Sequence, residues 1–227
     1  MYKRQTLVLI IGSKIILNWP TGLYLVVILA FIYGLTMPLF VSAYVYDFSG
    51  FYNFDWLKKL NIEDTLDKSN LNINAGFDET SYIIKSILPQ SNLQVYDFYN
   101  SKQHTEPAII RARKVSLVYH NTQQINSNSI PLNDNSVDNI FLISAIHEIR
   151  KQDEKVRFLK ECRRVCKPNG NVIMVEHLRD FPNLVAFTIG FTHFFSKATW
   201  RMAFDKAGFT SFKETKFTPF MSIFYCN

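Results

Sequence analysis

The chain has 227 residues, of which 48% are hydrophobic and 19% are charged. This length can form one α/β domain with a modest appendage, and the composition excludes wholesale disorder. The net charge is +6, but the basic residues are scattered and are not interleaved with aromatic residues, so we expect no nucleic acid partner. Three cysteines form no CxxC motif, which fits a reducing compartment.

The first 50 residues do not resemble a soluble domain. Residues 23–46 carry no charge, which is long enough for a helix that spans a bilayer. Residues 6–17 are also apolar, but Lys14 interrupts them and they are too short to span. The alternative is that Pro38 divides the long segment into two helices that pack on the following domain. A cleaved signal peptide fits less well, because no small-residue cleavage site follows. We therefore divide the chain into an apolar segment, 1–50, and a domain, 51–227.

Residues 69–100 show the opening pattern of a nucleotide-binding sheet. A buried strand at 71–74 leads to a tight turn around Gly76, a helix at about 80–88, and a second strand at 93–96 that ends in Asp97. A glycine turn lets the backbone approach a ligand, and an acid at the end of the second strand can accept hydrogen bonds from ribose hydroxyls. The pattern predicts a bound nucleoside.

The remaining elements continue the alternation of strands and helices. We expect strands at 115–119, 137–144 and 171–176, with a polar loop at 123–135. A helix at 153–166 ends at the turn 167–170, and another at 199–207 ends at Gly208. The tail can form two more strands around Pro219. The predicted fold class is α/β, a doubly wound, mostly parallel, Rossmann-like sheet with an apolar N-terminal helical segment.

Several polar and aromatic residues fall where such sheets place their sites. His147 follows a predicted strand at the carboxyl edge and could act as a general base, with Glu148 orienting it, or could be a structural histidine. Glu176 and His177 end the next strand, where they would touch a substrate or hold the following loop. The aromatic segment 181–200, which includes Phe191 and Trp200, would wall a lipophilic pocket or pack into the core. A metal site formed by His147, His177 and His193 is conceivable, but no residue set has metal-ligand spacing, so we expect no metal.

The segments FLISAIHEI, FLKECRRVCKPNG, VIMVEH and ATWRMAFDKAGF resemble the class I S-adenosylmethionine-dependent methyltransferases of the small-molecule branch. The resemblance implies S-adenosylmethionine as cofactor and assigns roles along the sheet edge. Asn74, Ala75 and Gly76 would form the loop under the methionine part, and Asp97 would hold the ribose. Phe98 would pack on the adenine, and Asn126 and Ser127 would read its amino group. Ser144 to His147 would flank the sulfonium. The family often has N-terminal helices that cap its site.

The glycine loop departs from the family pattern acid-x-Gly-x-Gly-x-Gly. Asn72 replaces the acid, Asn74 and Asp78 replace the outer glycines, and only Gly76 remains. The resemblance implies a methyltransferase. The aromatic segment 181–200 and the apolar N-terminus favour a small lipophilic or aromatic acceptor and a membrane-associated protein that faces the cytoplasm, or a cytoplasmic one if the first helices are caps. The alternatives are an inactive, membrane-tethered binding or scaffold subunit and a nicotinamide-dependent reductase. The sequence does not indicate an oligomeric state.

Overall fold

The computed structural model describes residues 2–60, 62–102, 107–115 and 117–227. Its centre is a seven-stranded sheet with the strand order β3-β2-β1-β4-β5-β7-β6. The strands from β3 to β5 are parallel, and β7 runs antiparallel between β5 and β6. In chain order the strands are β1 Ser69–Asn74, β2 Asn92–Asp97, β3 Gln123–Gln124, β4 Val137–Ile143, β5 Cys166–His177, β6 Phe212–Thr218 and β7 Met221–Cys226. The predicted doubly wound α/β fold is thereby confirmed.

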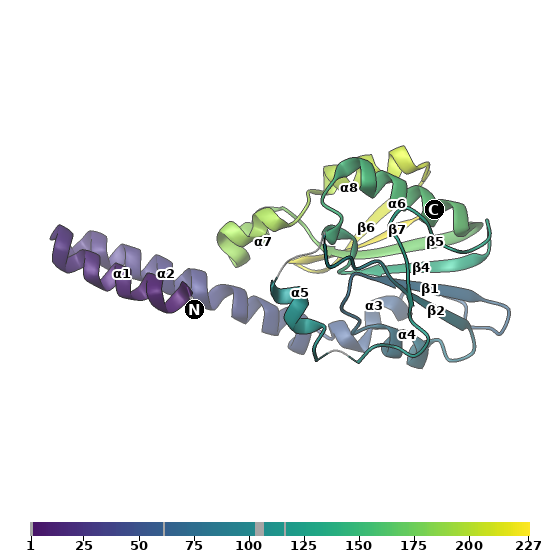
Figure 1. Cartoon of the computed structure of the whole chain (residues 1–227), viewed down its shortest axis with the longest axis horizontal. Coiled ribbons are helices and arrows are strands. Elements are labelled where there is room, and N and C mark those ends of the chain that lie inside the picture. The colour runs from purple at the N-terminus through teal and green to yellow at the C-terminus, as the bar shows by residue number, and fades with distance from the viewer. Residues whose placement is uncertain (1, 61, 103–106, 116) are drawn as a thin grey trace.

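Helices cover both faces of the sheet (Figure 1). On one face lie α6 and α8, and on the other lie α3, α4 and the end of α2. The helices are α1 Tyr2–Leu17, α2 Thr21–Ala43, α3 Asp55–Lys58, α4 Ser81–Ile87, α5 Pro107–Ala112, α6 Gln152–Val165, α7 Phe181–Phe187 and α8 Lys197–Ala207. Short π or 3-10 turns are η1 Tyr44–Phe48, η2 Phe51–Asn53, η3 Ile146–Glu148 and η4 Thr188–His193.

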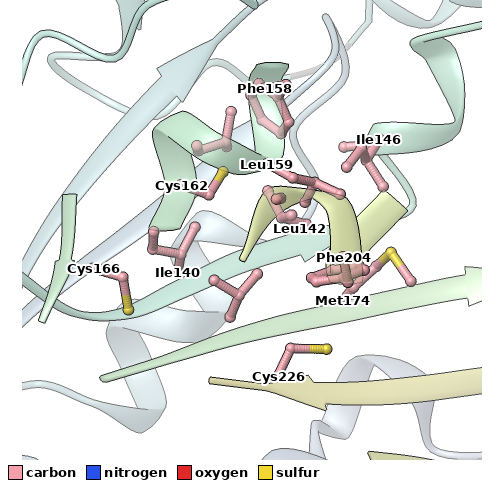
Figure 2. Packing of buried hydrophobic residues seen from close by; sticks show 14 of the residues in the cluster. Ile140, Leu142, Ile146, Phe158, Leu159, Cys162, Cys166, Met174, Phe204 and Cys226 are labelled. Carbon is pink, nitrogen blue, oxygen red and sulfur yellow. The ribbon is translucent and has the colours of Figure 1, made fainter. Parts of the chain in front are cut away.

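The core under α6 and α8 follows from the spacing of apolar residues. Phe158 and Leu159 lie four and three positions before Cys162 on α6, so the three side chains share one helical face. Figure 2 shows this face against Ile140 of β4 and Phe204 of α8. All three cysteines are buried and free, so they contribute apolar packing to the core.

Two predicted elements differ in the structure. The third strand is β3, within the predicted loop, while residues 115 and 117–119 form no strand and residue 116 lies outside the described residues. Leu117 is 80% exposed, whereas Tyr119 is buried, so this segment does not show the burial of a sheet strand. An edge strand needs only backbone pairing with its neighbour, and Gln124 adds side-chain hydrogen bonds to Asp97 O, 2.6 Å, and Tyr99 O, 2.8 Å. The turn at 167–170 falls within the bounds of β5 at a shift in register against β4.

The first two helices project from the domain as an apolar rod (Figure 1). Lys14 Nζ donates to Trp19 O at 2.6 Å and lies 5.4 Å from the centre of the Tyr24 ring, so the chain turns back between α1 and α2. Pro38 does not divide α2, which runs unbroken to Ala43. At its domain end the helix enters the core, where Val41 and Val45 are buried. One helix therefore links the rod to the packed domain.

Lys155 of α6 is fully buried between aromatic rings. Its Nζ lies 3.1 Å from the centre of the Phe195 ring and 4.6 Å from that of Trp200, and no residue in the described part of the chain accepts a hydrogen bond from it. Burial lowers the pKa of Lys155 to about 7; the charge of Arg150 lowers it as well, and Glu176 opposes the shift.

This buried amine makes stability depend on pH. The unfolded chain takes up a proton at Lys155 near pH 10.5, whereas the folded chain does so near 7, so the free energy of unfolding should rise as the pH rises through this window. Lys155→Met is expected to remove this dependence and to raise the free energy of unfolding at pH 7 by about 1–3 kcal/mol. Urea unfolding in detergent at pH 7 and 10 checks this, with exposed Lys160→Met as the matched control. Equal stability changes for both variants would contradict it.

Candidate active site

The parallel strands end together at one edge of the sheet, where cavities open. A cavity of about 680 Å³ lies between this edge and the end of α2, and a second of about 460 Å³ lies beyond β2. The first is lined by residues of α2 and the loops after β1 and β4, including Leu39, Ala43, Tyr46, Ala75, Phe77, Ser144 and Glu148. The second is lined by Phe98, Tyr99, Asn126, Ser127, Glu154 and Arg157, among others.

The loop after β1 is built around Gly76. This residue has φ +91°, and a Cβ here would lie 2.7 Å from the Tyr99 ring, so only glycine fits. Asn74 Oδ1 accepts a hydrogen bond from Gly76 N at 3.3 Å. Asn74 Nδ2 is buried, and among the described residues it has no hydrogen-bond acceptor. A buried donor without an acceptor is unfavourable, so this amide is available to a ligand in the loop.

Hydrogen bonds made by Asn72 and Asp78 hold the start of α4. These two residues stand where the family pattern has its acid and its last glycine. Asn72 Nδ2 donates to Thr80 Oγ1 at 3.0 Å and to Ser81 Oγ at 2.8 Å. Asp78 Oδ1 accepts from the backbone N–H groups of residues 80 and 81, at 3.1 and 3.0 Å. These N–H groups are the ones that a ligand carboxylate would otherwise use. The helix start is therefore satisfied from within the chain.

Asp97 at the end of β2 is 7% exposed and already has two partners. Its Oδ1 accepts from Tyr99 N at 2.8 Å, and its Oδ2 accepts from Arg113 Nη1 at 3.0 Å. Arg113 also donates to Gly76 O at 3.1 Å and stacks on the Tyr99 ring at 4.3 Å. One guanidinium thus bridges the ends of β1 and β2. The sequence did not indicate Arg113, because it lies in a loop 16 positions after Asp97.

His147 lies in η3, directly after β4, between two carboxylates. Its Nδ1 is 2.8 Å from Glu176 Oε2, and its Nε2 is 3.3 Å from Glu148 Oε1. Glu176 Oε1 also accepts from His147 N at 3.3 Å. Burial by itself lowers the pKa of His147, but the charges and hydrogen bonds of Glu176 and Glu148 outweigh it and raise the pKa to about 10. Glu148 and Ser144 line the large cavity, so the carboxylate of Glu148 is the charged group of this cluster at the cavity wall.

His193 of η4 completes this cluster from a distant part of the chain. The centres of the His147 and His193 rings lie 5.5 Å apart. One ligand atom from each of His147, Glu148 and His193 lies within 4.8 Å of the others. Spacing in the sequence could not show this arrangement, because η3 and η4 meet only through the fold.

The other predicted site residues are placed as follows. Phe98 is buried, and its ring centre lies 5.4 Å from that of Phe158 in the core. Ser127 Oγ donates to Glu154 Oε1 at 2.7 Å, and Asn126 lies beside Ser127 at the second cavity. Trp200 is fully buried in the core and is not among the residues that line the large cavity.

The remaining two lie near η4. Half-buried Phe191 is likewise absent from the wall of the large cavity. His177 is bonded at both ring nitrogens: Nδ1 to Phe220 O at 2.8 Å and Nε2 to Tyr46 Oη at 3.2 Å. Burial lowers the pKa of His177, so its ring is a neutral link between β5, η1 and the loop before β7.

Comparisons with known proteins agree with this architecture. Residues 81–174 match a family model described as a methyltransferase domain. A SAM-dependent methyltransferase from Aquifex aeolicus is 19% identical with a TM-score of 0.54, over 83% of this chain and 97% of that one. Human N-acetylserotonin methyltransferase, solved with SAM, is 15% identical with a TM-score of 0.55, over 88% of this chain and 58% of that one.

A further solved structure, a putative O-methyltransferase from Nostoc punctiforme, is 14% identical with a TM-score of 0.55, over 83% of this chain and 60% of that one. No curated protein matches the chain. The predicted resemblance is confirmed at the level of fold and domain: the chain has the class I S-adenosylmethionine-dependent methyltransferase fold, and its residues 81–174 match the methyltransferase domain.

Proposed function

We propose that the chain is an S-adenosylmethionine-dependent methyltransferase that acts on a small lipophilic acceptor at a membrane. The observation that carries this proposal is the large cavity. One wall is the carboxyl edge of the sheet with Glu148, and the other wall is the apolar helix α2, through Leu39 and Ala43. A polar reactive edge facing an apolar wall suits an apolar molecule with one reacting polar atom.

The residues at the strand ends fit the cofactor, with one rearrangement. Asp97 would hold the ribose hydroxyls, Gly76 leaves space beside the loop, and the buried amide of Asn74 offers a donor. Arg113 now occupies one oxygen of Asp97 and must release it. The methionine carboxylate would bind away from the start of α4, because Asp78 already occupies the N–H groups there.

The chemistry would be a displacement at carbon. S-adenosylmethionine bound at this edge supplies an electrophilic methyl group. The chain orients the acceptor in the cavity and accepts its proton. Because the pKa of His147 is about 10, this ring is already protonated at neutral pH, so Glu148 at the cavity wall is the proton acceptor. Glu176 accepts from Nδ1 of the protonated ring and so orients it, and Nε2 of the ring donates to Glu148 and holds that carboxylate in place.

The apolar rod suits a bilayer. The stretch Thr21–Asn53, which contains α2, is apolar enough to cross a membrane: its most apolar 18-residue window has a mean hydropathy of 2.3, and 6% of that window is buried. Helix α7 lies beside it, where Tyr33 Oη donates to Val185 O at 2.7 Å. This second segment also exposes apolar side chains, with Phe181 at 74% and Ile189 at 84%. We infer that α2 and α7 contact the same membrane and that the acceptor reaches the cavity past Leu39, which is 67% exposed.

The proposed function is tested by calorimetry and by methyl transfer. The full chain in detergent micelles is titrated with S-adenosylmethionine and its demethylated product. It is then incubated with labelled cofactor and lipid extracts in vesicles. Saturable binding and label in an organic-soluble product support the proposal. Failure of both the wild type and Arg113→Ala to bind cofactor would favour a scaffold role instead.

Arg113→Ala is expected to tighten cofactor binding by roughly 3–10-fold. The guanidinium competes with ribose hydroxyls for Asp97 Oδ2, and a hydrogen bond to a charged group is worth ~1.5–3 kcal/mol, of which partial exposure of Arg113 removes a share. Calorimetric dissociation constants check this, with Arg111→Ala, on the same segment, as the control. Weaker binding in Arg113→Ala would show that Arg113 contacts the cofactor instead of obstructing it.

The α7 contact is tested by Phe181→Ser combined with Ile189→Ser. The double variant should still float with vesicles, because the α1–α2 rod remains. Its KM for an acceptor embedded in vesicles should rise several-fold, since docking of the cavity mouth weakens, while its KM for the cofactor stays unchanged. An exposed polar pair, Lys102→Ser with Lys114→Ser, is the control. Equal acceptor KM values for the two double variants would show that α7 does not contact the membrane.

A further inference from the structure

We propose that His147, Glu148 and His193 form a binding site for one divalent transition metal ion, with Zn²⁺ as the best-suited ion. Binding of the ion does not depend on the proposed function, but its role in catalysis rests on it. The three side chains offer two imidazole nitrogens and one carboxylate oxygen within 4.8 Å of one another. Ligand atoms about 2.0–2.2 Å from a tetrahedral ion lie about 3.4 Å apart, and His147 Nε2 is 3.3 Å from Glu148 Oε1.

A buried carboxylate orients the first ligand. His147 Nδ1 lies 2.8 Å from Oε2 of Glu176, which is 2% exposed. This bond directs Nε2 toward Glu148 and His193, and the ion would take the place of the proton on Nε2, as metal binding to histidine does. Histidines that bind metals usually donate their other ring N–H to a carboxylate or carbonyl, which fixes the ring and raises its basicity. Glu176 thus has the position of an outer partner of a metal site.

Two arginines hold the segment that carries His193. Arg179 Nε donates to Phe194 O at 2.8 Å, and its Nη2 donates to Thr192 O at 2.5 Å, so the residues on both sides of His193 are fixed. Arg150 Nη1 donates to His193 O at 2.7 Å and to His147 O at 3.2 Å. A single guanidinium therefore ties together the two chain segments that supply the ligands. Ligands held in place before binding lose little freedom when the ion enters.

The donor set and charge favour a particular class of ion. Imidazole nitrogens suit Zn²⁺, Cu²⁺, Fe²⁺ or Ni²⁺, whereas Ca²⁺, Mg²⁺ and Mn²⁺ prefer oxygen ligands. A divalent ion would balance the two carboxylates, Glu148 and Glu176. Three protein ligands leave a coordination position open, as in catalytic zinc sites.

The open position points to an acceptor that binds through oxygen. Glu148 lines the large cavity, so an ion beside it would meet the reactive end of the acceptor. An ion there would bind the acceptor's hydroxyl oxygen and favour loss of its proton. One oxygen of Glu148 would bind the ion, and the other would take that proton. A metal ion at this site therefore predicts that the reaction in the cavity is O-methylation of a hydroxyl group.

The test uses the full chain in detergent micelles after treatment with EDTA and dialysis into metal-free buffer. Calorimetry with Zn²⁺ should give one equivalent, and Co²⁺ should show the visible absorption of a site with nitrogen and oxygen ligands. His193→Ala should weaken Zn²⁺ binding at least 100-fold, and Glu176→Gln should weaken it by roughly 10–100-fold. His120→Ala, an exposed histidine outside the cluster, should bind like the wild type. Circular dichroism and thermal melting establish that each variant is folded.

Absence of Zn²⁺ binding, or one equivalent that His193→Ala leaves unchanged, would overturn the metal site. Cofactor calorimetry on the same samples separates this result from failure of the proposed function. If cofactor binding and methyl transfer persist in EDTA, the chain is a methyltransferase that does not use this metal ion. Zn²⁺ binding without cofactor binding would leave the metal site in a chain that is not a methyltransferase.

Discussion

Replacing Asp97 by alanine is expected to weaken the binding of S-adenosylmethionine roughly 100-fold. The carboxylate is nearly buried at the end of β2 and is held at Oδ1 by the backbone N–H of Tyr99. It is thus oriented before a ligand arrives, and the two hydrogen bonds that it would accept from a ribose involve a charged partner. Each such bond contributes ~1.5–3 kcal/mol, so the loss of both costs at least ~3 kcal/mol, and this lower bound corresponds to a factor of about 100.

The measurement is calorimetry with the cofactor and its demethylated product, on Asp97→Ala and on the isosteric Asp97→Asn. The asparagine variant should retain part of the affinity, because its amide oxygen still accepts one bond. Combining Asp97→Ala with Arg113→Ala gives a double-mutant cycle. The benefit of removing Arg113 should vanish when Asp97 is absent. Retention of wild-type affinity in Asp97→Ala would mean that the ribose lies elsewhere.

Replacing Glu148 by glutamine is expected to lower kcat by about 10²–10⁴-fold while leaving the dissociation constant of the cofactor unchanged. The substitution keeps the shape of the side chain at the cavity wall but removes the group that accepts the acceptor's proton. Single-turnover methyl transfer with a defined hydroxyl-bearing acceptor measures the chemical step directly. Glu63→Gln, at an exposed glutamate outside both cavities, is the matched control. A normal rate in Glu148→Gln would assign proton removal to another group or to water.

Much of the framework follows from local patterns in the sequence. The unit from β1 to Asp97 was predicted because a buried strand, a glycine with positive φ and a short helix each have a strong local signal. The edge strand β3 was not, because Gln123 and Gln124 have no apolar pattern and join the sheet only through backbone pairing. Polar residues in an edge strand give the same local sequence pattern as polar residues in a surface loop, so the sequence cannot distinguish the two.

The candidate site was predictable only where its residues lie at strand ends. Asp97, His147 and Glu176 each follow or end a strand, so topology alone brings them to one edge. The partners that define their chemistry come from loops: Arg113 reaches Asp97, and His193 reaches His147. Trp200 shows the converse: it is fully buried in the core, and a large aromatic residue near a site has the same sequence signal whether it faces a ligand or the core.

The unbroken path of α2 has a mechanical consequence. The same rigid helix carries the apolar surface of the rod, supplies Leu39 and Ala43 to the cavity, and ends among core residues at Val41 and Val45. Lipid layers of different thickness change the tilt that a spanning helix adopts. A change in tilt would move one side of the reaction chamber relative to the sheet. Acceptor turnover would then vary with the thickness of the surrounding lipid, even where cofactor affinity stays constant.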